Sequence, residues 1–146
     1  MKRILFLLII VLTLTSCSYT SFDHIEDENG SDDYSLANIT EGDIINNTSS
    51  ISYISIYTND TNSGRASIEK FSGVKKITSL SGKDRIIVSF TVTEGNASLA
   101  LATKDEIIHY FNINENNQEY VIDTNKKLYL KLAGESAKIN LEYKYE

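Results

Sequence analysis

From about residue 51 onward, apolar and polar residues alternate with a period of two. The clearest case is the end of the chain, where Ala137, Ile139 and Leu141 alternate with Lys138 and Asn140. A period of two places alternate side chains on opposite faces of a β-strand, so that one face is buried and the other meets water. The pattern predicts strands near residues 52–58, 65–71, 74–80, 85–93, 97–103, 106–112, 118–123, 127–133 and 136–145.

Short stretches rich in Gly, Asn, Asp and Ser separate these strands and are typical of turns. They fall at 81–84, 94–96, 114–117, 123–125 and 134–136. Eight or nine short strands with no sustained helical period predict an all-β domain over residues 51–146. We expect an antiparallel two-sheet β-sandwich, jelly-roll-like, whose strand order the sequence leaves open.

The chain opens with the parts of an export signal. Lys2 and Arg3 precede an apolar run from Ile4 to Leu12, and small residues follow the run. The run is too short for a membrane span, which takes about 20 predominantly apolar residues. We therefore expect a signal peptide over residues 1–16, cleaved between Ser16 and Cys17.

Cys17 is the only cysteine in the chain, so it has no partner for an internal disulfide. Placed directly after Leu14-Thr15-Ser16, it resembles the lipobox of bacterial lipoproteins. The resemblance implies a covalent diacylglyceryl lipid on Cys17, and two acyl chains at about 0.8 kcal/mol per buried methylene suffice for stable anchoring. We expect a protein lipid-anchored at the extracytoplasmic side of the cell membrane, with no other cofactor.

Between the signal and the strands, residues 17–50 are polar and acidic, without regular apolar spacing. This composition predicts a disordered linker, although a short helical turn near Ser35 to Ile45 is an alternative for its end. The acidic run that ends in Asp27-Glu28-Asn29-Gly30 suggests a calcium-binding loop. With Gly30 at the sixth loop position, however, Ile25 would stand at the first position, where a carboxylate is required.

The net charge of the chain limits the classes of partner that it can bind. Without residues 1–16 the chain has 12 basic and 20 acidic residues. Nucleic acids and anionic lipid headgroups both require a basic patch. We therefore expect no nucleic acid partner, and membrane attachment through the lipid alone.

Few residues suit catalysis or metal binding. After residue 50 the only histidine is His109, inside the apolar run Ile107 to Phe111, and no cysteine follows Cys17. A zinc site lacks ligands, and a Ser-His-Asp triad lacks a Gly-x-Ser-x-Gly elbow to support it. Glu94 and Glu135 leave glycoside hydrolysis open, because the sequence does not give their separation. We predict no catalytic residue and no metal site.

Tyrosine is more informative. Tyr110 and Tyr129 fall on strand faces opposite the apolar stripes, and Tyr57 lies in the first predicted strand. Exposed aromatic rings stack on sugars or anchor protein partners, so Tyr57, Tyr110 and Tyr129 form a candidate binding face. Tyrosine is also a common half-buried residue of any sandwich, and the chain has no Trp, which sugar-binding faces usually include.

The segments Phe71–Gly73, Glu94–Asn96 and Leu130–Ile139 resemble small lipoproteins of Gram-positive bacteria. In these proteins a lipobox and a polar tether precede a compact β-domain whose last hairpin carries a glycine between two strands. The resemblance covers most of residues 66–146. It implies fold and location and carries no functional residues.

Two functions fit these features. The first is a non-enzymatic module that binds an envelope protein or a membrane complex. The second is a carbohydrate-binding module for cell-wall or external glycans. A concave cluster of exposed tyrosines would favour the glycan, whereas an open edge strand on a tyrosine-poor face would favour a protein.

Overall fold

The structure is a computed structural model that describes residues 36–146. The signal peptide, the cleavage site at Ser16 and Cys17, and linker residues 17–35 lie outside the described residues. Within 36–146 the chain forms α1 (Glu41–Asn46), β1 (Ser50–Ile51), β2 (Ile54–Asn59), β3 (Ser63–Leu80), β4 (Arg85–Ala102), β5 (Ile107–Phe111), β6 (Glu115–Val121) and β7 (Leu128–Tyr145). All strand pairs are antiparallel, so the predicted all-β antiparallel fold is confirmed.

The strands form one hydrogen-bonded sheet with the order β1-β3-β7-β4-β5; β2 also pairs with β3, and β6 also pairs with β4. Three strands, β3, β4 and β7, are each 18 residues long. β7 lies between β3 and β4 and pairs with both along nearly its whole length. These three strands therefore form the frame to which the shorter strands are added.

Each long strand bends near its middle. The register shifts within residues 68–73 of β3 and 92–96 of β4. Four residues in the bends have positive φ: Lys70, Gly73, Gly95 and Ser136. A left-handed residue at a register shift is typical of a β-bulge, which changes the direction of the strand. At residue 95 only glycine fits, because a Cβ atom there would lie 2.5 Å from the carbonyl oxygen of Ser136.

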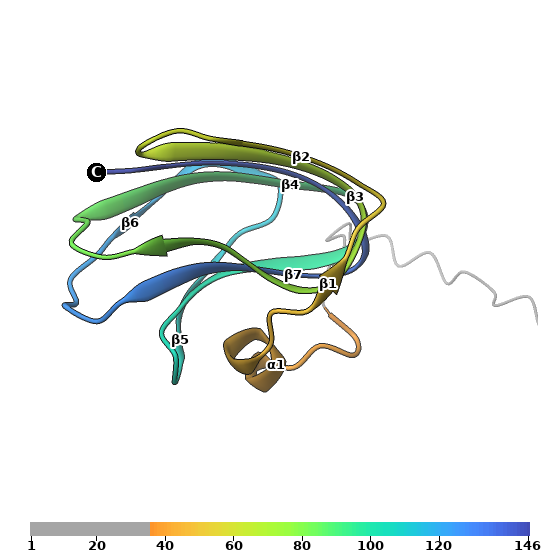
Figure 1. Ribbon diagram of the computed structural model, residues 1–146, viewed down its shortest axis with the longest axis horizontal. Coiled ribbons are helices and arrows are strands. Elements are labelled where there is room, and N and C mark those ends of the chain that lie inside the picture. Colours follow the sequence, from red (N-terminus) through yellow and green to blue (C-terminus); the bar gives the residue numbers. More distant parts are fainter. Residues whose placement is uncertain (1–35) are drawn as a thin grey trace, which may run out of the picture. The chain divides into compact units, whose positions relative to one another are not determined.

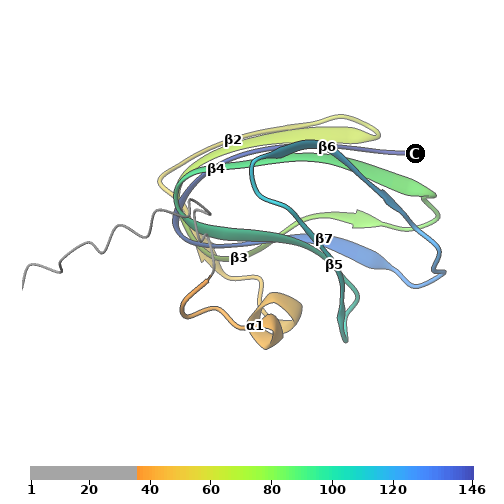
Figure 2. The ribbon, with the colours of Figure 1, turned by 180° about the vertical axis from the view of Figure 1, so that it is seen from behind.

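The bends fall side by side, so the whole sheet folds over into two layers (Figure 1 and, from behind, Figure 2). The first layer holds β2, β6, the halves of β3 and β4 that pair with them, and the half of β7 that lies between those halves. The second layer holds β1, β5 and the other three halves. The predicted two antiparallel layers are present, and they are formed by one continuous sheet. The three long strands keep the same order in both layers because they run through both.

The core lies between the layers. Alternate residues of the long strands point into it, as the period of two predicts. Fully buried examples are Ile68, Phe71, Phe90, Leu99, Leu101, Leu130, Leu132, Ile139 and Leu141. Each such side chain contributes about 1.5–3 kcal/mol by leaving water. The outward residues of the same strands remain free to form surfaces.

Six of the nine predicted strands are halves of β3, β4 and β7. The predicted turns at 94–96 and 134–136 are therefore wrong, since both lie inside a strand. Glycine beside Asn or Ser suits a bulge as well as a hairpin turn, because both need a positive φ. The predicted turns at 81–84 and 123–125 do separate strands.

At the end of the predicted linker the alternative of a short helical turn is the one observed, and residues 36–46 pack against the outer face of the second layer. α1 begins after Thr40 with a capping box, and Ile44 is only 3 % exposed. Ile44 packs with Ala100 and Ala133, on the strand face that alternation assigns to water. Sequence spacing misses this contact because a six-residue helix has room for only one such buried residue.

Two side chains of β7 fasten this docked segment, residues 36–46. The carboxylate of Glu135 accepts hydrogen bonds of 2.6–3.1 Å from the backbone N–H groups of residues 37–39. The ammonium of Lys131 donates to the carbonyl oxygen of Ile44 at 2.7 Å and to that of Ile45. These bonds match a carboxylate to free N–H groups and an ammonium to free carbonyls of the helix.

Candidate functional site

The most unusual surface of the described chain is one edge of the folded sheet. Residues 50–59, here called the β1–β2 edge, follow β3 along both layers, and β1 and β2 each pair with β3 alone in the described structure. Four large apolar side chains are exposed there: Ile51 (73 %), Tyr53 (80 %), Ile54 (55 %) and Ile56 (64 %). Exposed apolar side chains on an open edge strand mark a typical place for another chain to bind.

The sequence explains why β2 has this form. Ile54, Ile56 and Thr58 are β-branched residues at alternate positions, and they favour a strand. Ile56 and Thr58 lie on the outer face of the first layer, beside Arg65. Between them Tyr57 points the other way and packs against the core. β2 is thus held by its inner side chain while its two isoleucines stay in solvent.

The β1–β2 edge lacks the usual protection of an edge strand. Residues 44–59 contain no Asp, Glu, Lys or Arg, and the chain has no Pro. The β2–β3 ladder has no register shift. Natural edge strands are normally protected by charges, prolines, bulges or a covering segment. On the opposite side of the first layer, β6 does carry charges, with Glu115 and Glu119 among its seven residues.

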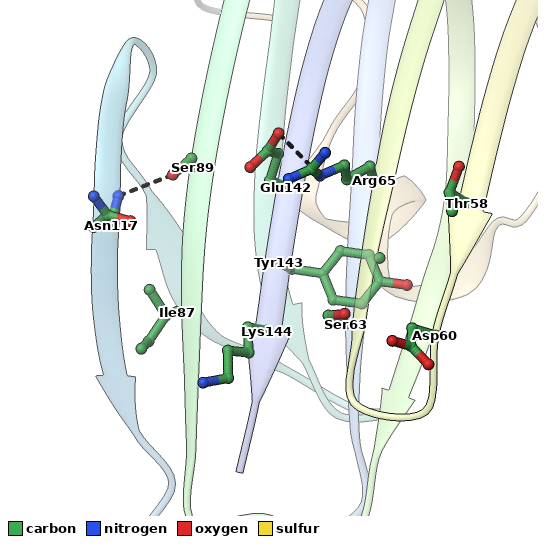
Figure 3. Close-up of a pocket in the computed structure, with 11 residues that line it drawn as sticks. Thr58, Asp60, Ser63, Arg65, Ile87, Ser89, Asn117, Glu142, Tyr143 and Lys144 are labelled. Atoms are coloured by element: carbon green, nitrogen blue, oxygen red, sulfur yellow. Dashed lines mark hydrogen bonds and ion pairs between the residues drawn. The ribbon is translucent and has the colours of Figure 1, made fainter.

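A polar groove lies next to β2 on the outer face of the first layer (Figure 3). It encloses about 490 Å³ and is lined by Thr58, Asp60, Ser63, Gly64, Arg65, Ile87, Ser89, Asn117, Glu142, Tyr143 and Lys144. Arg65 Nε and Glu142 Oε1 are 3.2 Å apart and mostly exposed. At the other side of the groove, the backbone N–H of Asn117 donates to Ser89 Oγ at 3.0 Å.

The groove offers no exposed aromatic ring among its lining residues. Its tyrosine, Tyr143, is 6 % exposed. The ring lies over Gly64, where a Cβ atom would come within 2.3 Å of the Tyr143 hydroxyl oxygen. That hydroxyl donates to Asn59 Oδ1 at 3.1 Å, and burial raises its pKa. Tyr143 is therefore a structural residue and cannot stack on a ligand in the groove.

The structure does not bring the three candidate tyrosines together. Tyr57 is half-buried between the layers, its hydroxyl oxygen has no hydrogen-bond partner within the described residues, and Lys75 Nζ lies 4.1 Å from its ring centre. Tyr57 is thus an inward residue, and its placement on a binding face is wrong. Tyrosine alternates with serine and isoleucine here, so the sequence alone does not say which side is buried.

Tyr110 and Tyr129 do share the outer face of the second layer, as alternation predicts. Tyr129 is half-buried, with Lys76 Nζ 5.7 Å and Lys127 Nζ 5.6 Å from its ring centre. Tyr110 donates to Glu41 Oε1 of α1 at 3.2 Å; burial and the nearby carboxylate raise its pKa to about 12. Tyr110 therefore contacts the docked segment, and the two rings form no common cluster.

His109 is packed at the side of the core, opposite the β1–β2 edge. Its ring stacks on Tyr120 with centroids 4.7 Å apart and meets the edge of Phe111 at 4.9 Å. Burial lowers the pKa of His109. Over residues 36–146 no cluster of three or more His, Cys, Asp or Glu side chains is arranged to hold a metal ion.

Comparison with known proteins gives one match. Residues 1–18 match the family described as prokaryotic membrane lipoprotein lipid attachment site. The chain begins with a lipoprotein attachment site. This supports the prediction of a bacterial lipoprotein anchored to a membrane through lipid, and Cys17 is the only cysteine in the matched residues. No curated protein and no solved structure matches the chain.

The short helix α1 is the only helix among the described residues, and no helix there is long and apolar enough to cross a bilayer. The sequence pattern predicted the strand that contains Ile54 and Ile56. It did not predict that these two side chains are exposed to solvent. The available signal was the charge-free run from residue 44 to 59, which is the longest between positions 36 and 146.

Proposed function

We propose that this lipoprotein is a non-enzymatic protein-interaction module on the extracytoplasmic side of the membrane, and that the β1–β2 edge is its contact surface. The observation that carries the proposal is the open strand β2, with Ile54 and Ile56 exposed on one face. An added strand would gain main-chain hydrogen bonds from β2 and side-chain burial from the isoleucines.

The alternative function, glycan binding, has less support. Sugar recognition uses exposed aromatic rings beside polar groups, and the polar groove beside β2 has only the buried Tyr143. Tyr110 and Tyr129 are engaged separately, one by Glu41 and one between lysines. The non-enzymatic part of the proposal is supported by the packing of His109 against two aromatic rings.

Lipid anchoring at Cys17 limits how far the folded domain can lie from the membrane. Eighteen residues lie between Cys17 and Leu36, the first described residue. A fully extended chain of that length spans at most about 65 Å. Leu36, where the described residues begin, therefore lies within this distance of the membrane, and a partner of the β1–β2 edge must be close enough to the membrane for the folded domain to reach it.

Photo-crosslinking in the native cell tests the proposal. A photoreactive residue replaces Ile56 in one variant and Val121 in the control, since both side chains are 64 % exposed but lie on opposite edges of the first layer. We expect one protein, identified by mass spectrometry, to be captured at position 56 and not at 121. Equal capture at both positions, or capture of glycan from a third probe at Lys144 in the groove, would contradict it.

A further inference from the structure

We infer that the partner of the β1–β2 edge is a second copy of this chain, with β2 paired antiparallel to β2 about Ser55. This inference rests on the proposed function and names the partner of the same surface. Three features of β2 support this pairing: the direction of its free backbone groups, the side chains that would come face to face, and the absence of charge at the contact.

The backbone groups fix where the pairing can be centred. β2 pairs with β3 from Ile54↔Glu69 to Asn59↔Gly64, and the N–H of Asp60 donates to Ser63 at 2.9 Å at the next even position. Hydrogen-bonded and non-bonded pairs alternate along an antiparallel ladder. Even-numbered residues therefore turn their backbone groups toward β3, and Ser55 and Tyr57 turn theirs to the open edge. A two-fold pairing about Ser55 makes Ser55 face its own copy as a hydrogen-bonded pair and so adds two main-chain hydrogen bonds. Tyr53, which would face Tyr57 in this register, lies outside β2 and keeps its N–H bonded to the carbonyl oxygen of Glu69 at 3.2 Å, so the paired strands are short, residues 54–56 of each copy.

The same register matches the side chains. Residues directly opposite in an antiparallel pair point to the same face, with Cβ atoms about 4.5–5.5 Å apart. Pairing about Ser55 places Ile54 opposite Ile56 of the second copy, and Ile56 opposite its Ile54. Four exposed isoleucines then form one apolar cluster on the outer face of the first layer. Centring on Tyr57 instead would set Ile56 against Thr58 and lose this cluster.

Charge allows identical chains to meet here. Residues 44–59 carry no acidic or basic side chain, so no like charges face each other across the two-fold axis. Residues 36–146 as a whole carry 14 acidic and 12 basic residues, since six acidic residues lie between positions 17 and 35. A self-complementary contact closes after two copies. Lipid anchoring also confines the copies to one membrane, which raises their effective concentration.

Disulfide trapping in the membrane tests the register. The full-length chain with Ser55→Cys is oxidised in intact cells, and the control carries Thr58→Cys on the same strand. Facing residues in a hydrogen-bonded pair have Cα atoms about 5.5 Å apart, within disulfide range. The two copies of residue 58 would be six residues apart along the strands, about 20 Å. We expect a covalent dimer from Ser55→Cys and at least tenfold less from Thr58→Cys and from the parent chain.

A second pair of variants tests the isoleucine cluster. Chains with Ile54→Cys and Ile56→Cys, carrying different tags, should cross-link to each other when expressed together. Ile56→Lys added to Ser55→Cys should reduce the dimer at least tenfold while leaving the thermal unfolding transition of the purified chain unchanged, because residue 56 is exposed.

The failures are distinguishable. If Ser55→Cys gives no dimer while the photoreactive residue at 56 still captures a different protein, the self-pairing is overturned and the interaction function stands. If neither variant captures a protein, both are overturned. A dimer of equal yield from Thr58→Cys would overturn the register, since that contact would not be specific.

Discussion

Replacing Ile44 by Ala tests whether the docked segment is a separate unit held on a finished sheet. Ile44 is 3 % exposed and packs with Val74, Ala100 and Ala133. Truncating a buried Ile to Ala costs about 2–5 kcal/mol in protein cores. We expect about 2–4 kcal/mol here, because a site on the outside of a layer relaxes more easily than one between two layers.

The loss of stability in the Ile44→Ala variant should be confined to the docked segment. Residues 36–46 contact the sheet from one side only, whereas the core between the layers does not include Ile44. The free energy that opens the docked segment should therefore fall while the stability of the sheet stays the same. At 1.4 kcal/mol per factor of ten, backbone exchange in residues 36–46 should accelerate about 30- to 800-fold.

Hydrogen exchange followed by mass spectrometry measures this directly. Peptides from 36–46 should lose protection in the Ile44→Ala variant, and peptides from β4 and β7 should keep it. Ile45→Ala serves as the matched control, since Ile45 is partly exposed. Equal acceleration in β7 would refute the reasoning, because the segment would then unfold only with the sheet.

Three further predictions follow. Backbone N–H groups of residues 37–39 lower the pKa of Glu135, so its contribution to docking is present above about pH 4.3, the ordinary value, and is lost as pH falls through the lowered pKa; the protection factors of residues 36–46, which are exchange rates relative to the intrinsic rate at each pH, should fall in acid, and Glu135→Gln should remove this pH dependence. Gly95→Ala should destabilise the fold far more than Gly82→Ala, measured by thermal unfolding, because both glycines have positive φ but only position 95 faces Ser136 at 2.5 Å; equal losses would show that the bend does not need glycine for space. Cys17→Ala should move the protein from the membrane fraction to the soluble fraction, measured by immunoblot, and unchanged fractionation would contradict lipid anchoring.

The alternation of apolar residues was enough to predict the strands and most of the core. Leu128, Leu130 and Leu132 are buried as that pattern indicates. The pattern could not show that β7 continues from Leu132 through Gly134 to Ile139, because a bulge and a turn use the same residues. Whether a bulge or a turn forms at Gly134 is decided by the pairing of β7 with β3 and β4, whose partner residues at that point lie more than 30 positions away in the sequence.

The candidate site was less predictable for a related reason. A strand of Ile, Ser and Tyr is compatible with the centre or the edge of a sheet, and only the order of strands decides which side is exposed. The tyrosines illustrate this. Tyr110 and Tyr129 are outward as predicted, whereas Tyr57 is inward because β2 presents its isoleucines to solvent. The short helix was offered as an alternative, but its packing on the sheet was missed, since its partners Ala100 and Ala133 are too small to mark a face as buried.

The fastening of residues 36–46 to β7 has a mechanical consequence. A force transmitted from the membrane through the residues before Leu36 reaches the contacts of Glu135 and Lys131 first. Both residues lie on β7, which has a neighbouring strand on each side. The load is therefore shared across the central frame. Without this attachment the same pull would act on β1 and β2 and peel them from β3 one hydrogen bond at a time. The docked helix thus keeps such a force away from β1 and β2.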